Sequence, residues 1–248
     1  MSAVGLIIGS IHDNLVLDIK SRSQTKTPFG LPSSPVLEVA FGNHKALCIL
    51  RHGETSNIPP HMVNYRANIW ALREHGVRFC IALSAVGTLD PNFLPGELAS
   101  PEQLVDYTWG REHSFCNGGT DLRHVDFTCP FDKSLREQLI SVAKLSDCFL
   151  QSGVYGVTQG PRLETASEID RLEKDGCTMV GMTAMPEAGL AKELNMSYAI
   201  CAMAVNFAAG RGDGTVGIHN QIERYISKAT GCLSRFINPL IAMLDKSY

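Results

Sequence analysis

The stretch NYRANIWALREHGVRFCIALSAVG, residues 64–87, decides the fold class. Its first part, NYRANIWALREHG, predicts a helix that stops at Gly76. VRFCIAL, residues 77–83, is a short apolar run typical of a buried strand. A polar segment that begins at Ser84 follows it directly. A helix that leads into a buried strand is the building unit of a layered α/β domain.

The same alternation of strands and helices extends along the chain in both directions. Further strands are predicted at residues 4–9, 36–41, 44–50, 177–182 and 197–206, and the second and third of these form a hairpin around Gly42 and Asn43. Further helices are predicted at residues 134–147, 164–176 and 183–194, and over the last ~30 residues, whose apolar spacing is that of a packed face. We therefore expect an α/β fold in a single domain, residues 1–248, with a central mixed, mostly parallel β-sheet flanked by helices.

Composition excludes several classes of protein. The net charge of the 248 residues is -3, which argues against nucleic-acid or membrane-surface binding. No apolar run approaches the ~20 residues of a membrane span. The start of the chain lacks the basic region of a secretion signal, so we expect a cytoplasmic protein. The eight cysteines include no CxxC pair, and those in apolar runs, such as Cys48, Cys80 and Cys201, predict buried thiols rather than disulfides or a zinc site.

Polar residues directly follow several of the predicted strands. The set comprises Ser10, Arg51 with His52, Ser84, Met182 with Thr183, and Asn206. Ligands of open α/β sheets bind beyond the carboxyl ends of the strands. Arginine offers forked donors to phosphate, and hydroxyls and backbone amides complete an anion site. Each residue alone has an ordinary alternative, a plain turn or a surface pair, but their shared placement predicts an anion site.

Three residues could contact a flat ligand. Asn206 offers a ring both a donor and an acceptor, although a turn asparagine is the simpler alternative. Glu164 follows Gly160 and Pro161, which predict a loop with a fixed backbone. It is either a first-turn acid favoured by the helix dipole or a carboxylate that accepts a ring N–H. Met182 either fills the core or lies under the ligand.

Five segments together resemble the trimeric purine nucleoside phosphorylase and methylthioadenosine phosphorylase family. They are RHG at residue 51, PPHMVNYRANIWAL at 59–72, SAVGTL at 84–89, TQGPRLETASEI at 158–169 and VGMTAMPEAGLAKEL at 180–194. The similarity extends over nearly the whole chain, and VNYRANIWAL and VNFAAG look most like the bacterial S-methyl-5'-thioinosine phosphorylase branch. The resemblance implies a homotrimer without metal or cofactor. It also implies reversible phosphorolysis, in which inorganic phosphate, the co-substrate, attacks C1' of a nucleoside.

The resemblance also implies roles for individual residues. Asn206, Glu164 and His52 are the expected catalytic residues. Glu164, with Leu163 beside it, matches the carboxylate placed opposite N1–H of a 6-oxopurine. Adenine-specific members carry an aspartate pair where this chain has Asn206, so hypoxanthine or guanine is the expected base. The expected phosphate ligands are Ser10, Arg51, His52, Ser84, Ala85 through its amide, and Thr183, and Met182 is expected beneath the ribose.

Three positions leave questions open. The family's first turn is usually Gly-Gly-Thr/Ser-Gly, whereas this chain has Ile8-Gly9-Ser10-Ile11, and isoleucine would be strained at a positive φ. His219 matches a histidine that contacts a ribose 5'-hydroxyl, which favours inosine or guanosine over methylthioinosine; a solvent-facing histidine at a helix start is the alternative. His124 and the loop at residues 106–119 match the subunit contact that lends a residue to a neighbouring site, with ordinary packing as the alternative.

The expected function is therefore phosphorolysis of inosine or guanosine to a purine base and ribose 1-phosphate. S-methyl-5'-thioinosine phosphorylase is the alternative within the family. A nucleosidase that uses water and a non-catalytic nucleoside-binding protein are more distant alternatives, and Arg51 with His52 argues against the nucleosidase because a hydrolase needs no anion site. The sequence leaves open the choice between inosine and guanosine, and between trimer and hexamer.

Overall fold

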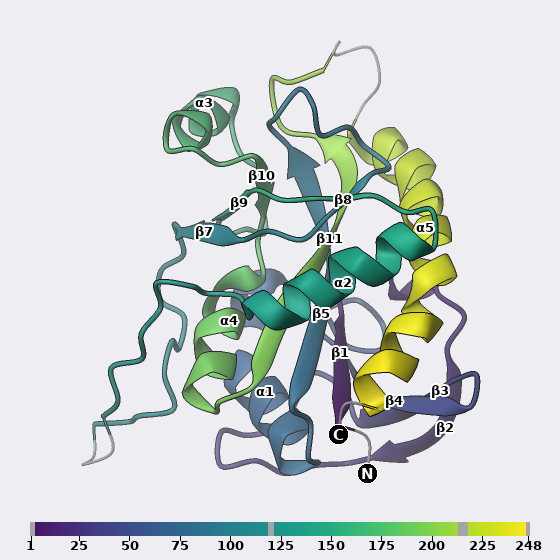
Figure 1. The fold of residues 1–248 in the computed structure, drawn as a ribbon. Helices are drawn as coiled ribbons and strands as arrows, with labels where there is room; N and C mark the ends of the chain where they lie inside the picture. Colours follow the sequence, from purple (N-terminus) through teal and green to yellow (C-terminus); the bar gives the residue numbers. More distant parts are fainter. Residues whose placement is uncertain (1–2, 119–121, 213–217, 247–248) are drawn as a thin grey trace.

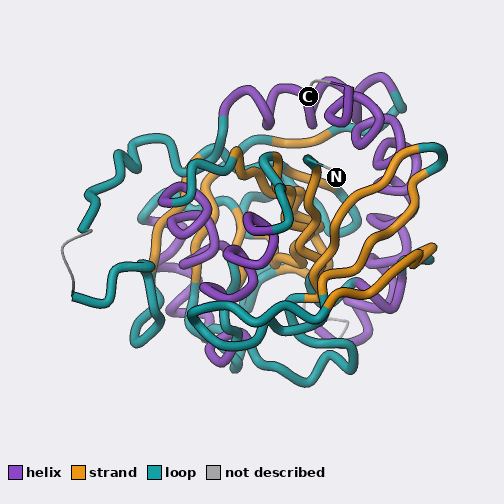
Figure 2. The backbone as a smooth tube through the Cα atoms, turned by 90° about the horizontal axis from the view of Figure 1, so that it is seen from below, coloured by secondary structure: helices purple, strands orange, loops and turns teal. Residues whose placement is uncertain are grey.

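The computed structural model describes residues 3–118, 122–212 and 218–246, without the side chains of residues 218–221 and 223. Over these residues the chain forms three layers, with a β-sheet between two groups of helices (Figure 1). Seen along the sheet, the strands form a central layer with helices on both sides (Figure 2). Among the described helices, none is long and apolar enough to cross a membrane.

Eleven strands make up the sheet of the described residues. Its centre is parallel, and is formed by β4 (His44–Leu50), β1 (Val4–Ile8), β5 (Phe79–Thr88) and β11 (Ser197–Phe207). β2 (Asp18–Ser23) and β3 (Val36–Phe41) extend it antiparallel beyond β4. Beyond β5 lie β10 (Met179–Gly181), β9 (Val154–Val157) and β7 (Gln103–Asp106), while β6 (Leu98–Ala99) and β8 (Leu150–Gln151) continue from β11. The expected mixed, mostly parallel sheet is confirmed.

Two helices cover each face of the sheet. α2 (Lys133–Leu145) and α5 (Ile218–Lys246) pack on one face, and α1 (Tyr65–Glu74) and α4 (Ala184–Glu193) on the other. α3 (Ala166–Lys174) packs beside β10 in a smaller apolar cluster. Short 3-10 turns, η1 (His12–Asn14) and η2 (Pro60–Met62), lie in the loops after β1 and β4.

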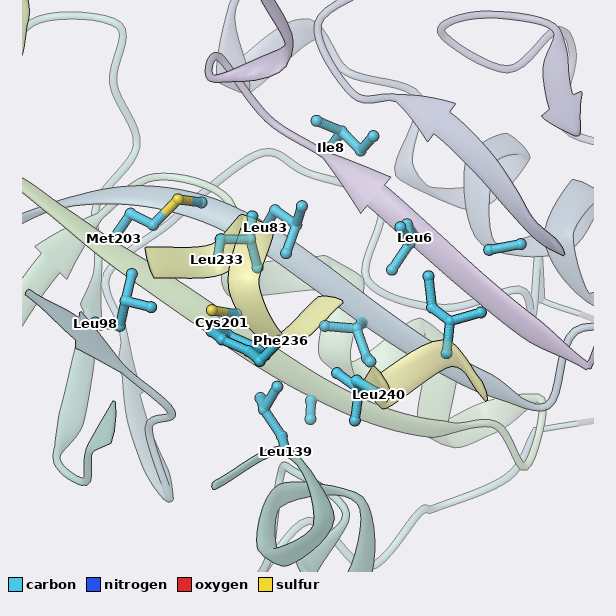
Figure 3. Close-up of a cluster of buried hydrophobic side chains, with 14 of the residues drawn as sticks. Leu6, Ile8, Leu83, Leu98, Leu139, Cys201, Met203, Leu233, Phe236 and Leu240 are labelled. Atoms are coloured by element: carbon cyan, nitrogen blue, oxygen red, sulfur yellow. The ribbon is translucent and has the colours of Figure 1, made fainter. Parts of the chain in front are cut away.

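The two apolar cores follow from the alternation of side chains along the strands. Leu83 and Cys201 point to the face covered by α5, while Ala82 and Ala202 point to the face covered by α1 and α4. This period of two is the geometry of an extended strand. Figure 3 shows the first core, where Phe236 of α5 lies over β11. Its full burial contributes roughly 1.5–3 kcal/mol.

A break in the strand pairing on one edge of β5 creates room for a ligand. β1 pairs with β5 up to Ile8 and Leu83, and on the same side β10 pairs with β5 only from Gly87 onward. Residues 84–86 lie between these two pairings, while their other edge stays paired with β11. The break lies at the carboxyl ends of parallel strands, where α/β sheets bind ligands.

Two local expectations need correction. The strand was expected to end at residue 83, but β5 continues to Thr88 because β11 pairs with it along this whole length. The cysteines were expected to form no disulfide, but Cys148 and Cys232 are joined, 84 residues apart in sequence. They meet because α5 packs across the end of α2, a contact that sequence spacing does not report. Six other cysteines are free.

Candidate active site

A cavity lies at the break in the strand pairing of β5. It is bounded by the carboxyl ends of β1, β4, β5, β10 and β11, by the loop that precedes α3, and by Ile222 of α5. Nine of the residues predicted for the site line it: Ser10, Arg51, His52, Ala85, Leu163, Glu164, Met182, Thr183 and Asn206. Polar residues that follow separate strands, such as Ser10, Arg51 and Thr183, therefore lie at one cavity, and their roles in a site stay predictions.

The turn after β1 comes close to Arg51. The Gly9 amide donates to the Leu83 carbonyl at 3.0 Å. A Cβ at Gly9 would lie 2.8 Å from Nη1 of Arg51 and 2.9 Å from the Leu83 oxygen. Glycine is required here because any side chain would separate the turn from the arginine.

The two isoleucines of this turn are not strained. Ile8 ends strand β1, and Ile11 has φ -88°, an ordinary right-handed conformation. Both side chains are buried in the apolar core. The strain considered from the sequence does not arise, because the turn uses no positive φ at these positions.

Arg51 is a buried cation held by a buried carboxylate. Its Nε and Nη2 donate to the two carboxylate oxygens of Glu187, each at 2.8 Å. The Tyr198 hydroxyl donates to the same carboxylate at 2.7 Å. Burial alone would lower the pKa of Arg51, but attraction and hydrogen bonds from Glu187 outweigh it and raise that pKa. Arg51 therefore stays charged in a dry site.

Arg51 keeps donors free for a ligand. A guanidinium has five N–H donors. Two are used by Glu187, and Nη1 donates a third to the Leu83 carbonyl at 3.3 Å. Among the described residues this leaves one N–H on each terminal nitrogen, and Arg51 lines the cavity. The geometry suits a phosphate oxygen in contact with both nitrogens.

His52 presents one ring nitrogen to the cavity. Its Nδ1 lies 2.8 Å from the Ile58 carbonyl, which can only accept, so Nδ1 carries a proton. Burial lowers the pKa of His52 below its ordinary value of 6.5, and the neighbouring charge of Arg51 lowers it further. His52 is therefore neutral at pH 7, and its Nε2, which bonds no described residue, can accept a hydrogen bond from a protonated phosphate oxygen.

Two hydroxyls lie near the same end of the cavity. Ser84 lies next to Gly9, and its buried Oγ has no hydrogen-bond partner among the described residues. Ser84 itself is not among the described residues that line the cavity, although its neighbour Ala85 is. Thr183 precedes α4, but its side chain makes no capping bond and lines the cavity.

A β-bulge directs Asn206 into the cavity. The register between β11 and β5 shifts between Ala204 and Asn206, which inserts Val205 as an extra residue. Bulges redirect side chains beside active sites. One N–H of the Asn206 amide donates to the Phe207 carbonyl at 2.6 Å. A Cβ at Gly87 would lie 3.2 Å from Nδ2, so Gly87 gives this amide its room.

Glu164 is oriented by a residue that the sequence did not single out. The Thr158 hydroxyl donates to Oε1 of Glu164 at 2.6 Å. This contact joins the two ends of the loop at residues 158–164, and among the described residues no hydrogen bond engages Oε2. Gly160 has φ 64° and lies against Met182, whose sulfur would be 2.5 Å from an added Cβ. The loop therefore needs glycine at this position, as its sequence indicated.

Some predicted residues are not brought into the cavity. His124 is exposed and is not among the described lining residues. The side chain of His219 lies outside the described residues. No group of three or more His, Cys, Asp or Glu among the described residues is arranged to hold a metal ion.

Sequence reasoning also missed part of the site. Glu187 is a charged residue among small and apolar neighbours in TAMPEAGL, residues 183–190, and that contrast was the available signal. The remaining lining residues are small or apolar neighbours of the predicted ones: Gly9, Pro60, Val86, Gly87, Val180, Gly181, Val205, Ala208, Ala209 and Ile222.

Comparisons with known proteins show the family of the chain. Residues 4–238 match the model of the phosphorylase superfamily. The chain is 43% identical over 226 residues to a probable S-methyl-5'-thioinosine phosphorylase of Xanthomonas campestris, with 90% of each chain covered. It is 37% identical to the 6-oxopurine nucleoside phosphorylase of Pyrococcus furiosus, with 99% of this chain and 94% of that protein covered.

A solved structure shows the same fold. Methylthioadenosine phosphorylase from Schistosoma mansoni, in complex with adenine, superposes with a TM-score of 0.90 at 30% identity, covering 98% of this chain and 92% of that one. The relatives are named as phosphorylases. The chain belongs to the phosphorylase superfamily and is an enzyme of its purine nucleoside phosphorylase family.

Proposed function

We propose that the chain catalyses the reversible phosphorolysis of 6-oxopurine nucleosides, inosine or guanosine, to the free base and ribose 1-phosphate. One observation carries the proposal: the cavity that contains the buried cation Arg51 also contains Asn206 and Glu164. The reaction needs a cationic site that binds phosphate. It also needs polar groups, such as an amide and a carboxylate, that bind the purine base.

The anion site would hold phosphate beneath C1'. Two free N–H groups of Arg51 and the hydroxyls of Ser10 and Thr183 supply donors. The amide of Ala85 and the buried hydroxyl of Ser84 lie at the break in β5 pairing, where phosphate oxygens could satisfy them. Holding the nucleophile in line with the reacting carbon removes much of the entropic barrier. No protein carboxylate has to attack the sugar, because phosphate is the nucleophile.

The base site would stabilise the leaving purine. One N–H of Asn206 is bonded to Phe207, which leaves its second N–H for O6 or N7, both acceptors in a 6-oxopurine. Oε2 of Glu164 would accept N1–H. Donors aimed at the charge that develops on the departing ring are the main source of rate enhancement in such sites. Met182 would lie beneath the ribose.

S-methyl-5'-thioinosine is a second candidate substrate. The relatives at 43–48% identity carry that name. The cavity wall also includes apolar side chains, Pro60 and Ile222, that suit a methylthio group. His219 favours a 5'-hydroxyl instead, because it could donate a hydrogen bond to oxygen and sulfur accepts only weakly.

We further propose that the enzyme is a cytoplasmic homotrimer that needs no metal or cofactor. His124, exposed in the loop after β7, would contact a neighbouring subunit's site. Multi-angle light scattering gives the mass directly. A monomer that is fully active at nanomolar concentration would contradict the trimer and the role of His124.

A phosphate-dependence assay tests the proposed function. Inosine cleavage is followed with phosphate-free enzyme, then with added phosphate. We expect hypoxanthine release only with phosphate. Release at the same rate without phosphate identifies a nucleosidase, and inosine binding without any release identifies a binding protein; either result overturns the proposal.

A further inference from the structure

Arg111 lies in the loop after β7 and is not among the described residues that line the cavity. It is half-buried, and its donors reach two segments that do line the cavity. Toward the first segment, Nη2 donates to the carbonyls of Gln159 at 2.8 Å and Thr158 at 3.4 Å. Nε donates to the side-chain oxygen of Gln159 at 3.1 Å. These contacts hold the start of the loop that ends in Glu164.

The other edge of the guanidinium holds the second segment. Nη1 donates to the carbonyls of Met182 at 2.8 Å and Met185 at 2.6 Å. The same group lies over the Tyr65 ring, 5.5 Å from its centroid, which keeps the guanidinium plane in place. These contacts hold the backbone on either side of Thr183.

Arg111 acts where strand pairing ends. The ladder between β9 and β10 stops at Val157 and Gly181. The Thr158 amide and hydroxyl both donate to the Gly181 carbonyl, at 2.8 and 3.4 Å. Beyond this point the two segments leave the sheet. A planar group with donors on both edges can fix two diverging backbones at a set distance.

A nucleoside needs that distance to be fixed. Its base would contact Glu164 on the first segment, and its sugar and phosphate would contact Met182 and Thr183 on the second. Misplacement of reacting groups by about 1 Å can cost about 100-fold in rate. We propose that Arg111 is a positioning residue that sets the spacing between the base-binding loop and the sugar-binding segment. This inference rests on the proposed function.

The test compares whole substrate with its separate halves. Arg111→Met removes all the donors, and Arg111→Lys keeps the charge but not the planar fork. Arg73→Met is the matched control, because Arg73 is also half-buried and donates to a carbonyl, that of Leu194, away from the cavity. For each variant, steady-state kinetics give kcat/KM for inosine, and calorimetry gives the dissociation constants of hypoxanthine and of inorganic phosphate.

For Arg111→Met we expect kcat/KM for inosine to fall about 100-fold, while each half-ligand binds within about threefold of wild type. Arg111→Lys should lose at least about tenfold in kcat/KM, and Arg73→Met should match wild type. If Arg111 had a purely structural role, the binding of hypoxanthine and of phosphate would instead weaken as much as kcat/KM for inosine falls.

Three outcomes overturn the inference. The first is a kcat/KM within threefold of wild type in Arg111→Met. The second is parallel loss of half-ligand binding, and the third is full activity in Arg111→Lys. If the wild-type enzyme shows no phosphorolysis, the proposed function and the inference both fail. If wild type is active and only the variants behave otherwise than expected, the inference alone fails. If Arg111→Met does not fold, Arg111→Lys decides.

Discussion

Arg51 and Glu187 form a two-bond ion pair that solvent does not reach. Both hydrogen bonds are 2.8 Å long, and the exposed fractions of the side chains are 1% and 0%. Removing water from two charges is costly, and losing one partner of such a pair leaves an uncompensated charge. Glu187 thus makes it possible for a cation to remain at the dry end of the cavity.

Glu187→Gln should lower the free energy of unfolding by about 3–5 kcal/mol, because Arg51 loses its buried counter-charge. Bound phosphate can supply a replacement charge, so phosphate should raise the melting temperature more in this variant than in wild type. Denaturant titration and thermal melts measure both effects. Glu38→Gln, which alters an exposed pair with Lys45, is the control and should change stability by no more than about 1 kcal/mol. An equal response to phosphate in Glu187→Gln and wild type would contradict this account.

Arg51→Ala should raise the KM for phosphate about 10- to 150-fold, since a charge-assisted hydrogen bond is worth roughly 1.5–3 kcal/mol. The single variant also leaves Glu187 unpaired. The double variant Arg51→Met with Glu187→Leu removes both charges and should recover stability without recovering phosphate binding. A normal phosphate KM in the double variant would remove Arg51 from the site.

Asn206→Asp should lower kcat/KM for inosine, because a carboxylate would face the accepting O6 of the base. An unpaired buried acceptor costs about 1–3 kcal/mol, which corresponds to roughly 5- to 150-fold. Relative activity on adenosine should rise, and parallel assays on both nucleosides measure the ratio. If kcat/KM of the wild-type enzyme is the same for adenosine and for inosine, Asn206 does not select the base.

His52 should make stability depend on pH in a defined direction. Its pKa in the folded chain lies below the ordinary value of 6.5, because burial and Arg51 disfavour the charged ring. As pH falls, His52 therefore becomes protonated at a higher pH in the unfolded chain than in the folded chain. The stability that neutral His52 provides is complete above pH 6.5 and is lost as pH falls from there through the lower, folded pKa. The difference in unfolding free energy between wild type and His52→Gln should shrink on acidification from pH 7.5 to about 5. A difference that stays constant would contradict a neutral, buried His52.

The preference of the site for the 5' substituent of the nucleoside is tested by comparing two substrates. We expect kcat/KM for inosine to match or exceed that for 5'-methylthioinosine, and His219→Val to reverse the order, because a site that bonds a hydroxyl discriminates against analogues without it. Steady-state assays on both substrates give the ratio. A preference of wild type for methylthioinosine by about tenfold or more, about 1.4 kcal/mol, would place the chain in the methylthioinosine branch.

The sequence predicted those parts of the site that depend on local pattern. Arg51, Thr183 and Asn206 each follow an apolar strand, and parallel strands bring their carboxyl ends to one edge, so the position of the cavity follows from the order of residues along the chain. Gly160 likewise indicated a fixed loop, and it has a positive φ.

Contacts between distant segments could not be predicted in this way. Glu187 lies 136 residues from Arg51, on a helix whose other buried residues are mostly apolar, and its role depends on packing across the sheet. The disulfide between Cys148 and Cys232 depends on the docking of α5 in the same way. The extension of β5 to Thr88 requires β11, which comes more than a hundred residues later. Such features follow from tertiary pairing rather than from local propensity.

The most direct test of the central claim is to identify the sugar product. Wild-type enzyme is incubated with inosine and inorganic phosphate, and the products are followed by phosphorus NMR and by hypoxanthine absorbance. The account predicts that ribose 1-phosphate appears in equal amount to hypoxanthine and that adding both products regenerates inosine. Hypoxanthine accompanied by free ribose, with the phosphate signal unchanged, would contradict it.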